Sequence, residues 1–90
     1  MNEQVNRKRA NNEKKFSYWA ELPNSGRRYW DEVPGRFGFK ARYVKEVNGK
    51  EETTRFYQEI YDAESNLIEI HEKFPEDSGH RRLKGGRDEG

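Results

Sequence analysis

Alternation of apolar and polar residues over residues 37–47, followed at once by Asn48 and Gly49, constrains the fold of this chain more than any other feature. A side-chain period of two over this length is typical of a half-buried β-strand. Asn-Gly between two such segments is the strongest short signal for a β-hairpin. The sequence therefore predicts an antiparallel hairpin with a two-residue loop, in which Ala41 lies opposite Phe56.

Two further strands are predicted, at about residues 52–61 and 67–74, because apolar residues alternate with polar ones in both. A loop at residues 63–65 places Ile60 opposite Ile68, so the apolar sides of all three strands coincide. A sheet that buries only one face requires this agreement.

Residues 65–74 also fit a helix that begins with Ser65 as its N-cap. The Ile-Glu-Ile-His alternation and its β-branched residues favour the strand. Upstream, the aromatic residues of the segment 16–33 flank a turn at residues 23–26 and predict a short hairpin, which we expect to pack on the apolar sheet face. The fold class is therefore α+β or mainly β, with an antiparallel meander sheet.

Composition limits the chain to one small domain. Only 30% of its 90 residues are hydrophobic, 39% are charged and none is cysteine, so the core must come from the 13% that are aromatic. Residues 1–15 are basic and almost without apolar groups, and residues 77–90 are polar and glycine-containing. We expect a flexible basic arm, a folded domain at 16–76 and a flexible tail.

No apolar stretch is long enough to span a membrane, and the first 15 residues lack the apolar region of a secretory signal. A cytoplasmic protein that does not contact membranes is the expectation. No metal-ligand spacing, nucleotide-binding glycine loop or nucleophile triad is present, so neither a metal site nor a cofactor is expected.

The predicted register gathers charged residues on the polar side of the sheet. Like charges placed directly opposite one another destabilise a sheet, unless an anion lies between them. The predicted register places three cations, Arg42, Arg55 and Lys73, in one row across the strands, which suggests a phosphate site; an ordinary lattice of salt bridges is the alternative. The phosphate-binding candidates are Lys40, Arg42, Arg55 and Lys73.

The same side of the sheet is predicted to bring Glu59, Glu69 and His71 together. Cleavage of RNA without a metal requires a general base for the 2′-hydroxyl, a general acid for the leaving oxygen and cations for the phosphate charge. A glutamate as base and His71 as acid would meet the first two needs.

RNA binding without catalysis requires less: cations for the phosphates and aromatic rings for the bases. Tyr57 and Tyr61 are the candidates for stacking. The leading prediction is a small protein that binds RNA or another polyanion, with metal-independent ribonuclease activity as an open question. The alternative is a non-catalytic protein-interaction module or a phage or plasmid accessory protein.

Residues 61–68, YDAESNLI, resemble the Tyr-Asp hairpin unit of YD-repeat proteins. Those proteins often end in small toxin cassettes, many of them ribonucleases built on a twisted antiparallel sheet, so the resemblance implies an RNA-cleaving module. Residues 82–86, RLKGG, resemble the diglycine tail of ubiquitin-like modifiers. Too few residues separate the hairpin from Gly85 and Gly86 for the β-grasp fold of that family, which favours a flexible tail.

Overall fold

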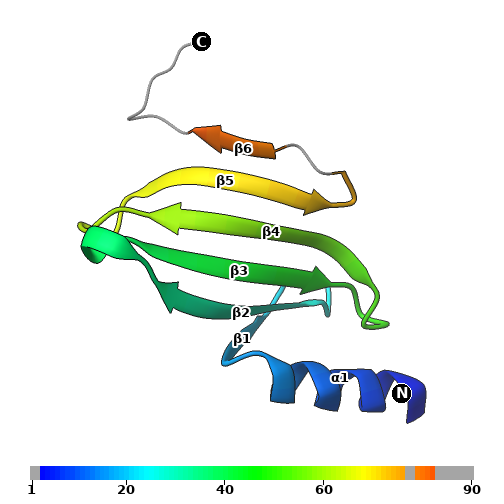
Figure 1. Ribbon diagram of the computed structural model, residues 1–90. Helices are drawn as coiled ribbons and strands as arrows, with labels where there is room; N and C mark the ends of the chain where they lie inside the picture. Colours follow the sequence, from blue (N-terminus) through cyan, green and yellow to red (C-terminus); the bar gives the residue numbers. More distant parts are fainter. Residues whose placement is uncertain (1–2, 77–78, 83–90) are drawn as a thin grey trace.

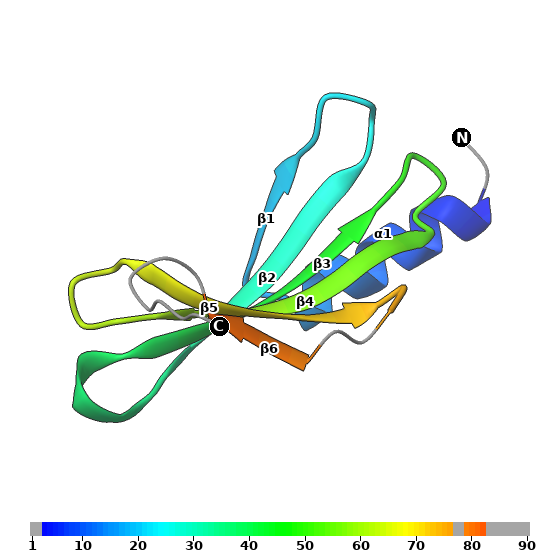
Figure 2. The ribbon, with the colours of Figure 1, turned by 90° about the horizontal axis from the view of Figure 1, so that it is seen from above.

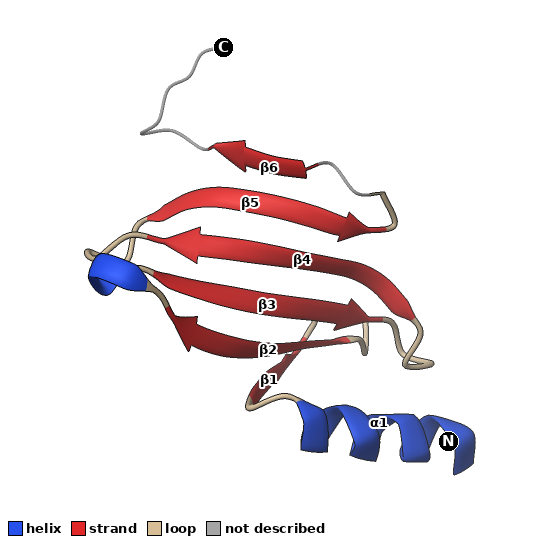
Figure 3. Ribbon diagram, viewed as in Figure 1, coloured by secondary structure: helices blue, strands red, loops and turns tan. Residues whose placement is uncertain are grey.

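The described residues form one α-helix, a short 3-10 turn and a single antiparallel sheet. The structure, a computed structural model, describes residues 3–76 and 79–82. Six strands pair in chain order, as Figures 1 and 3 show, so the predicted antiparallel meander is confirmed. The elements are α1 (Glu3–Lys15), β1 (Tyr18–Glu21), β2 (Arg27–Pro34), a 3-10 turn (Arg36–Gly38), β3 (Lys40–Val47), β4 (Thr53–Tyr61), β5 (Leu67–Phe74) and β6 (Gly79–Arg82).

Three of the hairpins share one loop geometry, in which a residue with positive φ ends a three-residue loop. Ser25, Glu51 and Ser65 are these residues, with φ of 73°, 66° and 68°. The predicted loop at 63–65 is confirmed by the hydrogen bond from the Asp62 nitrogen to the Asn66 oxygen, at 2.9 Å. The predicted two-residue loop at Asn48 and Gly49 is wrong. The last hydrogen-bonded pair of the hairpin is Asn48 with Glu52, so the loop consists of residues 49–51.

This longer loop moves the β3–β4 register: Ala41 lies opposite Ile60 instead of Phe56. The shift along β4 is by four residues, an even number, so residues 55–61 of β4 keep their predicted faces. The β4–β5 register changes differently. A bulge between Ile60 and Tyr61 adds one residue to β5, so that Ile60 lies opposite Glu69 and not Ile68. One extra residue reverses the faces of the strand beyond it, so the predicted faces of β5 are wrong over most of its length.

The sheet is strongly twisted, and α1 covers only one end of one face (Figure 2). We call this side the helix face; one row across it joins Tyr29, Lys45, Phe56 and Phe74. The other side, the open face, carries the row Tyr18, Trp30, Val44, Tyr57 and Glu72.

The buried core lies where α1 meets the sheet, with Val5, Phe16, Tyr29 and Val47. Val44 and Tyr57 are buried on the open face. The predicted core of Phe39, Ala41, Phe56, Ile60, Ile68 and Ile70 is wrong: none of these residues is buried, and Phe39 is 36% exposed. A single-layer sheet buries only those positions that a helix or long neighbouring side chains cover.

The ends of the domain also differ from the prediction. Residues 3–15 form α1 instead of a flexible arm, and Val5 and Asn12 are buried against the rest of the chain. The aromatic hairpin β1–β2 extends the sheet at its edge and does not pack on its face. In the predicted tail, residues 79–82 form β6, whereas 77–78 and 83–90, with Gly85 and Gly86, lie outside the described residues. Residues 67–74 form the predicted strand, not the alternative helix.

Candidate functional site

The structure divides the sequence-predicted site residues between the two faces. The open face holds the larger group: Lys40, Arg42, Arg55, Tyr57, Glu59 and Tyr61. Glu69, His71 and Lys73 belong to the helix face, because Glu69 and His71 lie opposite Ile60 and Gln58, and the Lys73 amine lies over Tyr43 and Phe56. The predicted row of three cations is therefore not formed.

The three catalytic candidates are also divided between the faces, so the predicted pairing of Glu59 with His71 is wrong, whereas Glu69 and His71 share the helix face. Glu59 lies opposite Ile70, so its side chain is on the open face, away from His71 and Glu69. The bulge after Ile60 is the physical cause, because it turns these two residues to the other side. Within the described part of the chain, no group of three or more His, Asp or Glu side chains is placed to hold a metal ion.

On the open face, the arginines are bound by carboxylates of neighbouring strands. Arg42 Nη2 lies 2.7 Å from Glu32 Oε2, and Arg28 Nε lies 3.3 Å from Glu46 Oε2. Arg55 donates to Glu72, with Nε 3.0 Å from Oε2. The charges of this face form a salt-bridge lattice, the alternative left open by the sequence.

The two tyrosines predicted to stack bases belong to this lattice. Tyr57 donates to Glu46 and Tyr61 to Glu59, both at 2.8 Å. Arg55 lies 4.1 Å above the Tyr57 ring, and Arg42 lies 5.0 Å from the centre of the Tyr61 ring. Burial and the hydrogen bond to Glu59 raise the pKa of Tyr61 to about 12. The arginines of this face are already paired with carboxylates, so they are poorly suited to bind phosphates. The two tyrosine rings are covered by arginines, so they are poorly suited to stack on bases.

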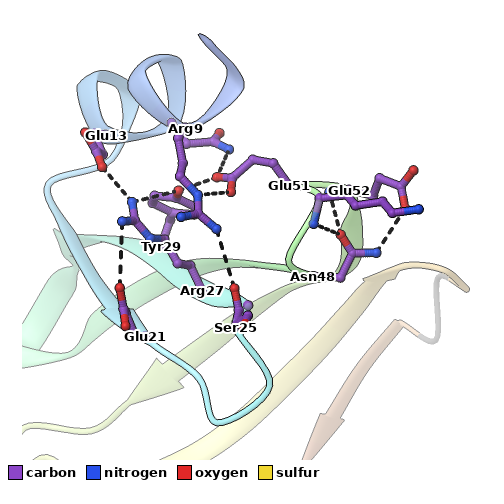
Figure 4. Close-up of polar contacts among 12 residues, drawn as sticks. Arg9, Glu13, Glu21, Ser25, Arg27, Tyr29, Asn48, Glu51 and Glu52 are labelled. Carbon is purple, nitrogen blue, oxygen red and sulfur yellow. Dashed lines mark hydrogen bonds and ion pairs between the residues drawn. The ribbon is translucent and has the colours of Figure 1, made fainter. Parts of the chain in front are cut away.

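A buried polar cluster fixes α1 against the sheet (Figure 4). Glu51, in the β3–β4 loop, accepts hydrogen bonds from Tyr29, from Arg9 Nε at 2.8 Å and from Asn12 Nδ2 at 3.1 Å. Burial alone would raise the pKa of Glu51, but these hydrogen bonds outweigh it and hold the pKa below its ordinary value. On the other side of Tyr29, Arg27 pairs with Glu13 at 2.6 Å. The cluster therefore sets which side of α1 faces outward.

The outward side of α1 is basic and polar. Six of its exposed residues share one stripe of the helix, because each lies three or four residues from another member of the set: Gln4, Arg7, Lys8, Asn11, Lys14 and Lys15. None of the four cations lies within 4 Å of a carboxylate among the described residues. The helical spacing of these residues can be read from the sequence. Which side of the helix faces the sheet depends on the contacts of Arg9 and Asn12 with Glu51, and only the tertiary structure shows them.

The basic stripe continues onto the helix face of the sheet. Lys45 Nζ donates to Asn12 Oδ1 at 3.0 Å, and burial, together with the charge of Lys15, lowers the pKa of Lys45. Lys73 Nζ lies 5.5 Å from the Tyr43 ring centre. Lys15, Lys45 and Lys73 have no ion pair with any described carboxylate, so their charges are available to a ligand.

Two adjoining hollows, each of about 430 Å³, lie between α1 and strands β3 and β4. They share Lys15, Lys45 and Thr53. We call them together the basic groove. One half is polar and is lined by Lys8, Asn11, Asn12, Lys15, Lys45, Glu51, Glu52 and Thr53. The other half is aromatic and is lined by Lys15, Phe16, Lys45, Thr53, Phe56 and Phe74.

Comparison of the chain with protein-family models, with curated proteins and with solved structures finds no match. The resemblance of residues 61–68 to YD-repeat toxin cassettes therefore stays a prediction. In the described part of the chain, no helix has both the length and the apolar character that crossing a bilayer requires.

Proposed function

We propose that this protein binds RNA through the basic groove and the outward side of α1. The observation that carries the proposal is the segregation of cations with and without carboxylate partners. Arginines of the open face are neutralised by neighbouring glutamates. Eight described cations have no such partner, and six of them lie on α1 and the helix face of the sheet, the exceptions being Arg36 and Lys50. The six are Arg7, Lys8, Lys14, Lys15, Lys45 and Lys73.

Local charge matters more here than net charge, which is only +1. The field at a surface is set by charges within about a Debye length, roughly 8–10 Å in physiological salt. From Lys8 to Lys15 the helix rises by roughly 10 Å, because each residue adds about 1.5 Å. These two lysines and Lys45 line the groove, so they can bind successive phosphates of one strand.

The proposal is for binding and not for cleavage. RNA cleavage by Glu59 and His71 needs both side chains at one phosphate, and the two lie on opposite faces. Cleavage by Glu69 with His71, which share the helix face, stays a prediction and is not part of the proposal. RNA binding needs no such constellation, because cations that release counterions from the phosphates supply most of the affinity.

A second candidate, binding of a protein partner, is favoured by apolar side chains exposed at the far end of the sheet. Phe37 is 86% exposed, and Val33 and Phe39 lie nearby around a hollow of about 410 Å³. This end of the sheet, which includes Arg36, lies away from the basic groove. RNA binding and binding of a protein partner would therefore use separate surfaces and can be tested separately.

The test measures fluorescence anisotropy of a labelled 12-nucleotide RNA over a range of salt concentrations. Lys8→Gln with Lys15→Gln removes two charges from the groove, and Arg36→Gln with Lys40→Gln removes two from the far end. We expect the groove variant to lower affinity about tenfold and to reduce the salt slope by about 0.7 per lost contact. The control variant should keep both values. Equal losses in both variants, or no binding by the wild type, would reject the proposal.

A further inference from the structure

The aromatic half of the basic groove has features that phosphate binding alone does not need. Phe56 and Phe74 lie opposite each other on β4 and β5, and Phe16 follows the end of α1. Phe74 is 45% exposed and lines the hollow together with Phe16 and Phe56. Exposed rings beside a cationic surface are typical of sites where unpaired bases stack.

Cations surround this aromatic hollow. Lys15 Nζ lies 5.8 Å from the Phe16 ring centre, and Lys73 Nζ lies 5.9 Å from the Phe56 ring centre. Lys45, opposite Phe56 in the register, lines both halves of the groove. An occupant that fits should therefore combine a flat apolar group with negative charges on both sides. A nucleotide within a strand has this chemistry, because each base is flanked by two phosphates.

The size of the hollow agrees with such an occupant. At about 430 Å³ it falls within the range of small-ligand sites, about 300–1,000 Å³, so a single base fits in it. Bases of a duplex are paired and stacked inside the helix and cannot reach the phenylalanines. A single strand can turn one base into the hollow and keep its phosphates on Lys15 and Lys45.

We infer that the aromatic hollow binds an unpaired base, so that the groove selects single-stranded RNA over duplex RNA. The inference rests on the proposed RNA binding and adds the form of RNA that is recognised. Phe74 is the decisive residue, because it lines the hollow at an exposed strand end where a substitution disturbs little packing.

The experiment compares one 12-nucleotide single strand with its blunt 12-base-pair duplex, using wild type, Phe74→Ala, Phe74→Tyr and Phe37→Ala. Phe37→Ala is the matched control, since it removes an exposed phenylalanine ring outside the groove. We expect the wild type to prefer the single strand by about tenfold, the contribution of one stacked base. Phe74→Ala should lose this preference and leave duplex binding and the salt slope unchanged. Phe74→Tyr and Phe37→Ala should retain the preference.

A second readout uses a single strand that contains 2-aminopurine, whose fluorescence falls when it stacks. We expect quenching with the wild type and with Phe74→Tyr, and its loss with Phe74→Ala. Equal affinity for both RNA forms, unchanged in Phe74→Ala, would overturn the inference and leave the proposed function intact. Absence of binding to either form would overturn both. Thermal melting of each variant establishes that it is folded.

Discussion

Tyr29 donates its phenolic hydrogen to Glu51, joining the second strand to the β3–β4 loop beneath α1. Tyr29 has no exposed surface and Glu51 is only 4% exposed. A buried carboxylate is tolerated when hydrogen bonds and a positive charge compensate for its lost hydration. Arg9 and Asn12 of α1 provide the positive charge and further hydrogen bonds. Glu51 therefore holds the helix against the sheet and so fixes the position of the groove between them.

Replacement of Glu51 should destabilise the fold strongly. Glu51→Ala leaves the Tyr29 hydroxyl and the Arg9 guanidinium without their acceptor, so we expect the free energy of unfolding to fall by about 3 kcal/mol. Glu52→Ala is the matched control, because Glu52 is exposed in the same loop. It should cost less than about 1 kcal/mol. Urea denaturation measures the free energy of unfolding of both variants. Equal losses of stability in the two variants would contradict the prediction that the buried cluster stabilises the fold.

Stability should fall in acid because of the same residue. The pKa of Glu51 is lower in the folded protein than in the unfolded chain, so its contribution is present above the unfolded value, about 4.3, and is lost as pH falls through the folded value. We expect the melting temperature to decrease below about pH 4. The backbone hydrogen bond from Asn66 lowers the pKa of Asp62 as well, so the measurement is made in an Asp62→Asn background. Glu51→Gln should flatten the remaining profile; an unchanged slope would contradict the assignment.

Stability should also fall in alkali. Burial, and then hydrogen bonds to Glu51 and Glu59, raise the pKa of Tyr29 and Tyr61 to about 12. Their stabilisation is complete below the unfolded value of about 10 and is lost as pH rises toward 12. Burial and the hydrogen bond to Glu46 raise the pKa of Tyr57 further still. Absorbance at 295 nm should therefore show three tyrosines ionising above pH 11, and Tyr61→Phe should remove one of these late protons. Ionisation of all five tyrosines near pH 10 in the folded protein would refute the prediction.

Deletion of residues 1–14 should lower the melting temperature by about 10 °C or more. The deletion removes Val5 from the core and Arg9 and Asn12 from Glu51, which then remains buried without its charged partner. A truncated protein with an unchanged transition would mean that α1 contributes nothing to the fold. Differential scanning calorimetry gives the answer directly.

Arg55→Ala separates the two faces of the sheet. Arg55 is paired with Glu72 and lies 3.9 Å from Glu46 on a partly exposed surface, so its loss should cost about 1 kcal/mol or less. RNA affinity and its salt slope should not change, because the open face lies outside the proposed interface. A weaker affinity with a reduced slope would return the phosphate site to the open face, where the sequence alone had placed it.

The sequence by itself determined the central strands of the sheet, β3 to β5, but not the edge strand β6. Alternating residues placed β4 within one residue and β5 at its observed bounds, and turn chemistry located the loop at 63–65. These are local properties, because period-two burial and turn geometry depend on neighbours along the chain. The antiparallel meander followed, since such short loops can join only adjacent antiparallel strands.

Tertiary structure alone decided which residues meet. A bulge of one residue after Ile60 turned His71 and Lys73 away from Glu59, and no local signal marks that bulge. The helix α1 has little apolar surface of its own; its place depends on a glutamate that lies 39 residues further along the chain than Asn12. Strand pairing across a bulge and the burial of a polar cluster depend on contacts between distant segments of the chain. These contacts, and the energies that they contribute, exist only once the chain has folded.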